Sequence, residues 1–171
     1  MIDWSLALRP AKITEYKLIK TFFEQGRLFQ HSLGFVQWLE GYPSQLLYEK
    51  DVESGRGYII ESGKTPIGYV VIDFNGDDEY DRLSHIWKID GHYVVVHRFV
   101  LCNEFRGKGL SSLILSMIES YVASQDVRII RFDTGISNMP MQALLKAGGY
   151  TNLGKYNFVW GERVAYEKCL K

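Results

Sequence analysis

The chain has few cysteines and no long apolar run, and each absence excludes a class of protein. Its 171 residues include two cysteines, which match no metal-ligand spacing and are too few for a disulfide scaffold, so reduced thiols in a cytoplasm are expected. No segment approaches the roughly 18 consecutive apolar residues that a transmembrane helix needs. The first residues also lack the basic and apolar regions of a signal peptide. We therefore expect a cytoplasmic protein without a metal.

The chain also has no excess charge of either sign. Twenty basic and twenty acidic residues cancel, and no polybasic run occurs, so neither nucleic acid nor a membrane surface is an expected partner. Internal repeats, low-complexity tracts and linkers are absent as well. Because 46% of the residues are hydrophobic and 14% aromatic, we predict a single domain over residues 1–171 with a sizeable core.

The most informative segment is a strand that runs through a glycine-spaced basic turn into a helix. The β-branched run at 93–96 continues to Leu101, which is typical of a buried strand. In the turn Arg106–Gly109 the two glycines allow positive φ and close approach of a ligand. The first turn of the following helix points unpaired N–H groups outward, with the positive end of its dipole. The predicted apolar face of that helix consists of Leu110, Leu113, Ile114, Met117, Ile118, Tyr121 and Val122. This arrangement suits a pyrophosphate, and Lys108 adds positive charge beside it.

Two other phosphate-binding loops do not fit. A Walker A loop would require a glycine five residues before Gly63-Lys64-Thr65, but the preceding glycine is Gly57, one residue too far away. That segment is predicted to be a hairpin turn. A dinucleotide-binding fingerprint fails because Ser112 stands where its third glycine belongs.

Two motifs in this order resemble the GNAT superfamily of N-acetyltransferases. The acetyl-CoA loop of that superfamily reads Gln/Arg-x-x-Gly-x-Gly/Ala, and Arg106, Gly109 and Ser111 occupy its defined positions. Residues 138–150 resemble the superfamily segment Asn-x-x-Ala-x-x-Leu-Tyr-x-x-x-Gly-Phe/Tyr, with Asn138 as a natural N-cap. The resemblance is good over residues 57–168 and looser over residues 1–56.

The resemblance implies an α/β fold, in which a mixed central sheet has helices on both faces and two parallel strands splay apart at the acetyl-CoA site. The predicted elements follow the same order. They are a strand at 5–9, helices at 14–32 and 44–55, strands at 57–62, 67–74 and 93–101, a helix from 110, a strand at 127–133, a helix at 138–147, and strands at 150–155 and 162–168. The acidic segment 75–91 is predicted to be a long loop or a poorly regular excursion.

The resemblance also implies the reaction, which is acetyl transfer from acetyl-CoA to a primary amine of a small molecule or peptide. Main-chain groups of the splayed strand would bind the pantetheine arm and the thioester oxygen. The residues implied in acetyl-CoA binding are Phe99, Val100, Leu101, Arg106, Gly107, Lys108, Gly109, Leu110, Ser111 and Asn138. A homodimer, which is common in the superfamily, stays open as an alternative to a monomer.

Candidate proton-transfer groups follow from the same resemblance. Asp133 ends its strand where several members place a general base, although a carboxylate there could instead cap the following turn. His97 is the second candidate, with a satisfied core histidine as the alternative. Leu145 occupies the position of the superfamily's usual acid, a tyrosine, and cannot donate a proton, so Tyr156 is predicted as the substitute. Arg98 is expected to point away from His97 and to pair with an acid.

The acceptor site is expected near the first two helices and the acidic segment. Aromatic residues there could line a pocket, and acids would suit a cationic amine. These residues are Trp38, Glu40, Tyr42, Asp77, Asp78, Tyr80, Asp81 and Trp87. Two rivals remain open. One is the same fold acting on a longer acyl-CoA or on a protein N-terminus, and the other is a non-catalytic acyl-CoA sensor, which Leu145 would suit.

Overall fold

The computed structural model describes residues 5–171 and has a seven-stranded sheet in the order β1-β2-β3-β4-β5-β7-β6. The strands are β1 (Leu6–Pro10), β2 (Gly57–Ser62), β3 (Thr65–Asp73), β4 (Tyr93–Leu101), β5 (Ile129–Gly135), β6 (Thr151–Phe158) and β7 (Gly161–Cys169). Neighbouring strands are antiparallel except β4 and β5, which are parallel. The predicted mixed sheet is confirmed.

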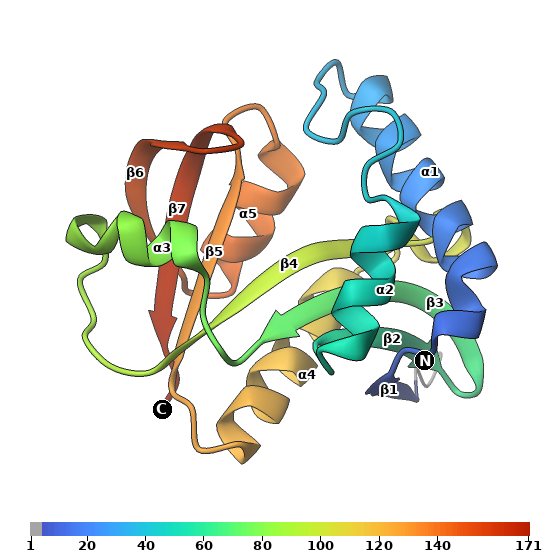
Figure 1. The fold of residues 1–171 in the computed structure, drawn as a ribbon, viewed down its shortest axis with the longest axis horizontal. Helices are drawn as coiled ribbons and strands as arrows, with labels where there is room; N and C mark the ends of the chain where they lie inside the picture. The colour runs from blue at the N-terminus through green and yellow to red at the C-terminus, as the bar shows by residue number, and fades with distance from the viewer. Residues whose placement is uncertain (1–4) are drawn as a thin grey trace.

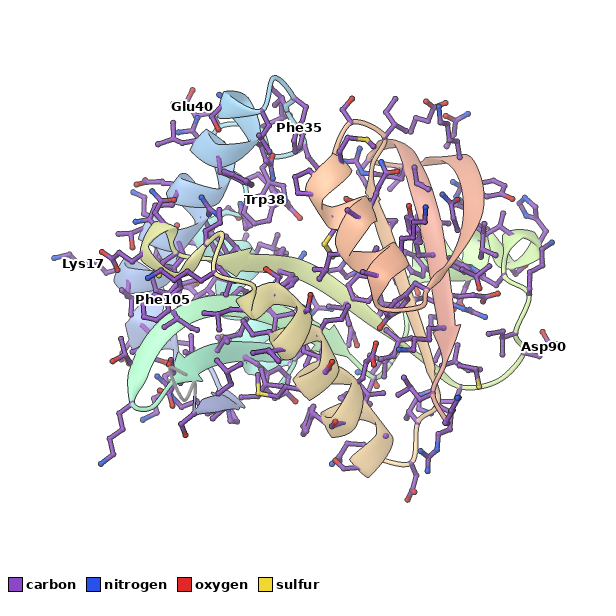
Figure 2. The ribbon with its side chains drawn as sticks, turned by 180° about the vertical axis from the view of Figure 1, so that it is seen from behind. Lys17, Phe35, Trp38, Glu40, Asp90 and Phe105 are labelled. Carbon is purple, nitrogen blue, oxygen red and sulfur yellow. The ribbon has the colours of Figure 1, made fainter. Side chains whose placement is uncertain are left out.

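Helices cover both faces of this sheet. They are α1 (Tyr16–Ser32), α2 (Gln45–Glu53), α3 (Asp78–Arg82), α4 (Leu110–Ser124) and α5 (Met139–Ala147), with 3-10 turns at Ile13–Glu15, Ser84–Ile86 and Asn103–Phe105. Helices α2 and α3 lie on one face with α1 beside α2, and α4 and α5 lie on the other (Figures 1 and 2). The layers therefore match the predicted α/β class.

The acidic segment 75–91 is more ordered than predicted. It contains α3 and a 3-10 turn, and its apolar side chains at 80, 83, 86 and 87 are buried against the sheet. These positions recur every three to four residues, which is a helical spacing that the surrounding aspartates obscure. A long loop is therefore wrong for this segment, and the alternative of a poorly regular excursion fits its two short helical turns. The segment instead forms a second small core with Tyr93, Val95 and Phe158.

Strands β4 and β5 pair over only part of their length. The parallel ladder joins Tyr93–Val95 to Ile129–Arg131 and then ends. Just beyond it, Arg98 has a φ of 52° at the point where the register between β3 and β4 shifts, which is a β-bulge that bends β4 away. Among the described residues, the rest of β4 has no strand partner on its β5 side. The predicted splay of parallel strands is confirmed.

A buried carboxylate holds the bulge in place. Asp51 of α2 has no exposed surface and accepts from Arg98 Nε at 3.0 Å and Nη2 at 2.7 Å. The same carboxylate accepts from Arg56 Nε at 3.0 Å and from the Tyr69 hydroxyl at 3.1 Å. Charge-assisted bonds of this kind are strong enough to compensate a residue with positive φ. Arg98 is thus paired with an acid, as predicted.

Three further features concern membrane-spanning helices, metal-binding groups and the thiols. No helix within residues 5–171 combines the length and apolarity needed to cross a membrane. Over the same residues, no group of three or more His, Cys, Asp or Glu side chains is placed to hold a metal ion. Cys102 is buried, Cys169 is exposed, and both are free thiols.

Candidate active site

The turn before α4 forms an open cradle of main-chain N–H groups. Gly107 and Gly109 both have a φ of 75°, and a Cβ built on either would meet no atom within 4 Å. Gly109 is the N-cap of α4 and provides no side-chain cap, so the first-turn N–H groups at Leu110 and Ser111 face outward. The positive end of the helix dipole adds to them. These properties fit a phosphate group.

Arg106 stabilises this turn through hydrogen bonds and also places a positive charge beside it. Its guanidinium donates to Asn103 Oδ1 at 2.6 Å and to the Leu101 carbonyl at 2.7 Å, and lies 4.2 Å above the Phe29 ring. Partial burial lowers the pKa of Arg106, although an arginine remains charged at neutral pH. Arg106 therefore fixes the end of β4 to the turn and leaves a positive charge beside the cradle.

A cavity of about 570 Å³, here called the loop cavity, extends from this turn along β4. It reaches α1 at Phe29 and the start of α5 at Pro140. Seven of the ten residues predicted to bind acetyl-CoA line it, namely Phe99, Val100, Leu101, Arg106, Gly107, Ser111 and Asn138. Lys108, Gly109 and Leu110 belong to the adjacent cradle, where the Leu110 side chain is buried in the core. An unpaired strand edge next to a phosphate cradle fits the pantetheine and pyrophosphate parts of coenzyme A.

Asn138 connects α5 to the loop that precedes α2. Its Oδ1 accepts from the Met141 N–H at 3.3 Å, which confirms the predicted N-cap, and its Nδ2 donates to Gln37 Oε1 at 2.9 Å. Gln37 Oε1 also accepts from the Gly135 N–H at 3.1 Å. The loop around Gln37 is thereby tied across the splay to the end of β5.

A second cavity, of about 610 Å³ and here called the His97 cavity, lies beside the first. It is lined by side chains of the loop before α2, of β4 and β5 beyond their last pairing, and of the β6–β7 turn. Both cavities are lined by Gln30, Trp38, Phe99, Asn138 and Met141. The two spaces therefore adjoin at the splay, with Phe99 of β4 between them.

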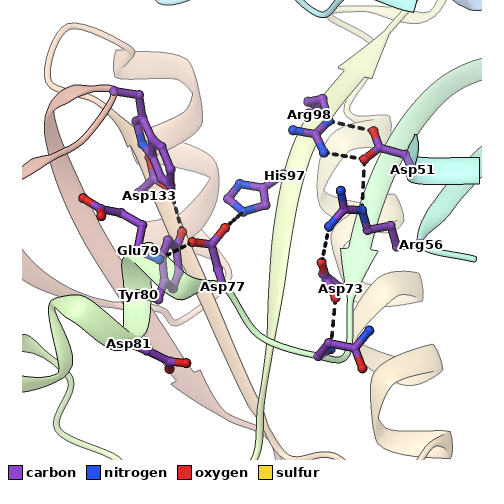
Figure 3. Close-up of polar contacts among 12 residues, drawn as sticks. Asp51, Arg56, Asp73, Asp77, Glu79, Tyr80, Asp81, His97, Arg98 and Asp133 are labelled. Atoms are coloured by element: carbon purple, nitrogen blue, oxygen red, sulfur yellow. Dashed lines mark hydrogen bonds and ion pairs between the residues drawn. The ribbon is translucent and has the colours of Figure 1, made fainter. Parts of the chain in front are cut away.

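His97 is oriented by a carboxylate from α3. Its Nε2 lies 3.1 Å from Asp77 Oδ2, while Asp77 Oδ1 accepts from the Glu79 N–H at 2.8 Å and so caps α3 (Figure 3). Burial opposes ionisation of Asp77, but its interactions with His97 and the backbone outweigh burial and lower the pKa of that carboxyl. When Nε2 donates to Asp77, the lone pair of His97 is on Nδ1.

Asp133 accepts hydrogen bonds through both oxygens. Oδ1 accepts from the Tyr80 hydroxyl at 2.6 Å, and Oδ2 accepts from Trp160 Nε1 at 3.0 Å and lies 3.5 Å from Arg163 Nε. Burial and the neighbouring Asp133 charge raise the pKa of Tyr80 well above its usual value, so its phenol keeps the proton it donates. Asp133 is thus a fixed hydrogen-bond acceptor in the cavity wall.

Neither Tyr156 nor Leu145 lies in the wall of either cavity. Tyr156 on β6 lines neither cavity. Its hydroxyl donates to the Leu153 carbonyl at 3.0 Å and its ring packs near His85. Leu145 has no exposed surface and lies in the main core, whereas Leu144, one residue earlier, lines the loop cavity. The helical phase of α5 therefore turns the supposed acid position away from the site.

Sequence reasoning also misjudged part of the acceptor side. Trp38, Tyr42 and Asp77 line the His97 cavity as expected, but Glu40, Asp78, Tyr80, Asp81 and Trp87 do not. Trp160 and Arg163 were missed. They belong to the β6–β7 hairpin, and no local pattern links that hairpin to Asp133.

Comparisons with known proteins agree with this geometry. A model of the acetyltransferase (GNAT) family matches residues 18–150. A GNAT-family acetyltransferase from Streptococcus agalactiae 2603 is 27% identical, with 98% of both chains covered and a TM-score of 0.85. One from Listeria monocytogenes 4b F2365 is 21% identical over 99% of both chains, with a TM-score of 0.76.

A structure of AAC(6')-Ib in complex with ribostamycin and coenzyme A shares the fold at 18% identity, covering 96% of this chain and 93% of that one, with a TM-score of 0.74. No curated protein matches the sequence at a significant level. The family match spans most of the chain, including the splayed strands β4 and β5 and the glycine cradle. The chain therefore belongs to the acetyltransferase (GNAT) family and is an acetyl-CoA-dependent acyltransferase.

Proposed function

We propose that the protein transfers the acetyl group of acetyl-CoA to a primary amine held in the His97 cavity. The observation that supports this is the meeting of the two cavities at Phe99, where β4 has separated from β5. Acetyl-CoA supplies an activated acetyl group as a thioester. The unpaired edge of β4 then offers main-chain groups to the carbonyl oxygen, where negative charge develops in acyl transfer.

We propose His97 as the group that takes the proton of the amine. An alkylamine is protonated at neutral pH and must lose a proton before it can attack. Asp77 orients the imidazole through Nε2 and stabilises the imidazolium that forms when Nδ1 takes the proton. Asp133 is the second candidate, but both of its oxygens already accept hydrogen bonds.

We propose that the thiolate of coenzyme A leaves without a proton from α5. The α5 side chains that line the loop cavity are Pro140, Met141 and Leu144, and none of them can donate a proton. Water would then protonate the departing thiolate. A sensor that only binds acyl-CoA would have no use for an oriented histidine on the acceptor side.

Further proposals concern the domain, the cellular location, the acceptor and the partners. We propose one domain, residues 1–171, acting in the cytoplasm on a small-molecule or peptide amine, with no metal, nucleic acid or membrane. The similar chain from Streptococcus agalactiae is covered over 98% of its length, which supports a single domain. AAC(6')-Ib, solved with ribostamycin and coenzyme A, supports a small amine as the acceptor. A homodimer remains an open proposal.

Thiol release measured with a panel of amines tests the proposed function. The wild type should release coenzyme A from acetyl-CoA only when a suitable amine is added, and His97→Asn should lower this rate. Comparing acetyl-CoA with longer acyl-CoA donors tests the chain length. If the protein bound acetyl-CoA but released no coenzyme A with any of the amines, the result would favour the sensor.

A further inference from the structure

The charged side chains around the His97 cavity already have partners within the protein. Asp77 pairs with His97, and Asp133 lies 3.5 Å from Arg163 Nε. The remaining pairs are Arg98 with Asp51, and Arg56 with Asp51 and Asp73. No carboxylate that lines this cavity is therefore left over for the second or third ammonium of a polycation, and separating a buried pair to provide one is costly.

Between these pairs the cavity walls combine nine apolar or aromatic side chains with four polar ones, Gln30, Gln37, Thr134 and Asn138. The apolar and aromatic lining residues are Trp38, Leu39, Tyr42, Leu47, Val96, Phe99, Phe132, Met141 and Trp160. Trp38 lies on the α1 side, where its ring packs edge to face on Phe23 of that helix (Figure 2). A ligand that filled the cavity would replace water against these surfaces, which favours an apolar body.

Exposed apolar side chains are concentrated in the segments around this cavity, and three of them, Leu39, Tyr42 and Trp160, line it. Of the thirteen large hydrophobic side chains that are exposed among residues 5–171, nine belong to the segments that border it. The nine are Leu33, Val36, Leu39, Tyr42 and Leu46 on one lip, and Ile136, Met139, Val159 and Trp160 on the other. Single exposed hydrophobics are common on protein surfaces, but a concentration on two facing lips marks a binding site.

The two lips come from distant parts of the chain. The loop before α2 forms one, and the β5–α5 and β6–β7 turns form the other, at the same end of the molecule (Figure 1). Gln37 ties the first lip to Gly135 and Asn138 of the second. The loop before α2 is consequently held against the β5–α5 turn.

We infer that the acceptor is a small primary amine with a single positive charge, whose aromatic or branched aliphatic body lies between these lips. This inference rests on the proposed function. The ammonium reaches the His97–Asp77 pair and the faces of the surrounding aromatic rings. The cavity of about 610 Å³ has the size typical of small-molecule sites.

The test compares amines that share the reacting group and differ in the body. With acetyl-CoA fixed, kcat/KM for 2-phenylethylamine and isoamylamine should exceed that for methylamine at least thirtyfold, because apolar burial is lost with the smaller body. Spermidine and ribostamycin should react more slowly than 2-phenylethylamine. A preference for either polycation would overturn the inference and leave the proposed acetyl transfer standing, whereas no reaction with any amine would overturn both.

A substitution at Leu39, with a matched control elsewhere, tests whether this lip contacts the apolar body of the amine. Leu39 is 71% exposed and Leu28, away from the lips on α1, is 58% exposed, so neither Leu39→Asp nor Leu28→Asp disturbs the core. Leu39→Asp should lower the ratio of kcat/KM for 2-phenylethylamine to kcat/KM for methylamine at least fivefold, because the added charge acts on both ammonium groups and only the apolar contact differs, while Leu28→Asp should leave this ratio unchanged. Equal effects of the two variants would overturn the assignment of this lip.

Two other occupants of the lips have distinct outcomes. If a second copy of this chain covered them, sedimentation would show a dimer that Leu39→Asp converts to a monomer. If a peptide were the acceptor, a tripeptide with an apolar first residue would react faster than 2-phenylethylamine. Either result would overturn the inference of a small apolar amine.

Discussion

Asp77 Oδ2 lies 3.1 Å from His97 Nε2, and this contact joins α3 to the unpaired part of β4. Asp77 performs two tasks with its two oxygens, since Oδ1 caps α3 through the Glu79 N–H. The position of the histidine therefore depends on the acidic segment being folded against the sheet. Tyr80 of the same helix reaches Asp133 on β5, so α3 contributes to both walls of the splay.

Asp77→Asn separates these tasks. Asparagine is as good an N-cap as aspartate, so α3 should keep its start, but the charge beside His97 is lost. We expect kcat/KM to fall at least tenfold, which is about 1.4 kcal/mol in the barrier. Asp78→Asn is the matched control, since Asp78 is exposed one residue away. Equal losses in both variants would contradict a positioning role.

The same substitution should have a pH-dependent effect on stability. The pKa of Asp77 is lowered in the folded protein, so its contribution is complete above the unfolded value of about 3.9 and is lost as pH falls through the folded value. We expect Asp77→Asn to lower the free energy of unfolding by about 1 kcal/mol at pH 7. Urea titrations from pH 7 to pH 3 should show this difference shrinking below pH 4. A difference that grew toward acid would contradict the sign.

Replacing each candidate base by asparagine shows which of the two contributes more to catalysis. His97→Asn should lower kcat/KM by about 10²–10⁴, the usual contribution of a general base. Asp133→Asn should lower it less, because the carboxylate is held by Tyr80 and Trp160 and acts as a fixed charge. Steady-state assays from pH 6 to pH 9 give both numbers. The reverse ranking would make Asp133 the base.

The acid predicted from sequence should prove dispensable. Tyr156→Phe removes a hydroxyl that donates to the Leu153 carbonyl and lines neither cavity. We expect turnover within twofold of the wild type and a small loss of stability from the broken hydrogen bond, about 1 kcal/mol. A tenfold loss of turnover at unchanged melting temperature would bring Tyr156 back as a proton donor.

Local sequence patterns predicted where the helices of the site begin. The start of α4 at Gly109 and the capping of α5 by Asn138 follow from residues within one helical turn. The inward face of α4 was less well predicted. Leu113 is 53% exposed and Leu115 is buried, because the sheet contacts a face rotated slightly from the most apolar stripe.

The site itself depends on contacts that no local pattern encodes. Asp77 meets His97 across 20 residues, and Trp160 meets Asp133 across 27. The family resemblance placed His97 and Asp133 near the splay, but not the partners that determine their chemistry. Those partners come from α3 and the β6–β7 hairpin, whose positions follow from packing on the sheet.

The glycine cradle can be tested against a glycine with the same backbone strain. Gly109→Val puts a branched side chain where a phosphate would approach, and it also strains a residue with a φ of 75°. Gly55 has a φ of 68° and equally open surroundings but lies after α2, so Gly55→Val imposes similar strain away from the cradle. Both variants should lower the melting temperature of the free protein.

Only the cradle variant should lose the response to acetyl-CoA. At a hundred times its dissociation constant, acetyl-CoA should stabilise the wild type and Gly55→Val by roughly 2.7 kcal/mol. Gly109→Val combined with Arg106→Ala should show no shift in differential scanning fluorimetry, because the backbone approach is blocked and the adjacent charge is gone. An undiminished shift in that double variant would mean that acetyl-CoA binds elsewhere, whereas a lost shift in Gly55→Val would mean that strain alone accounts for the effect.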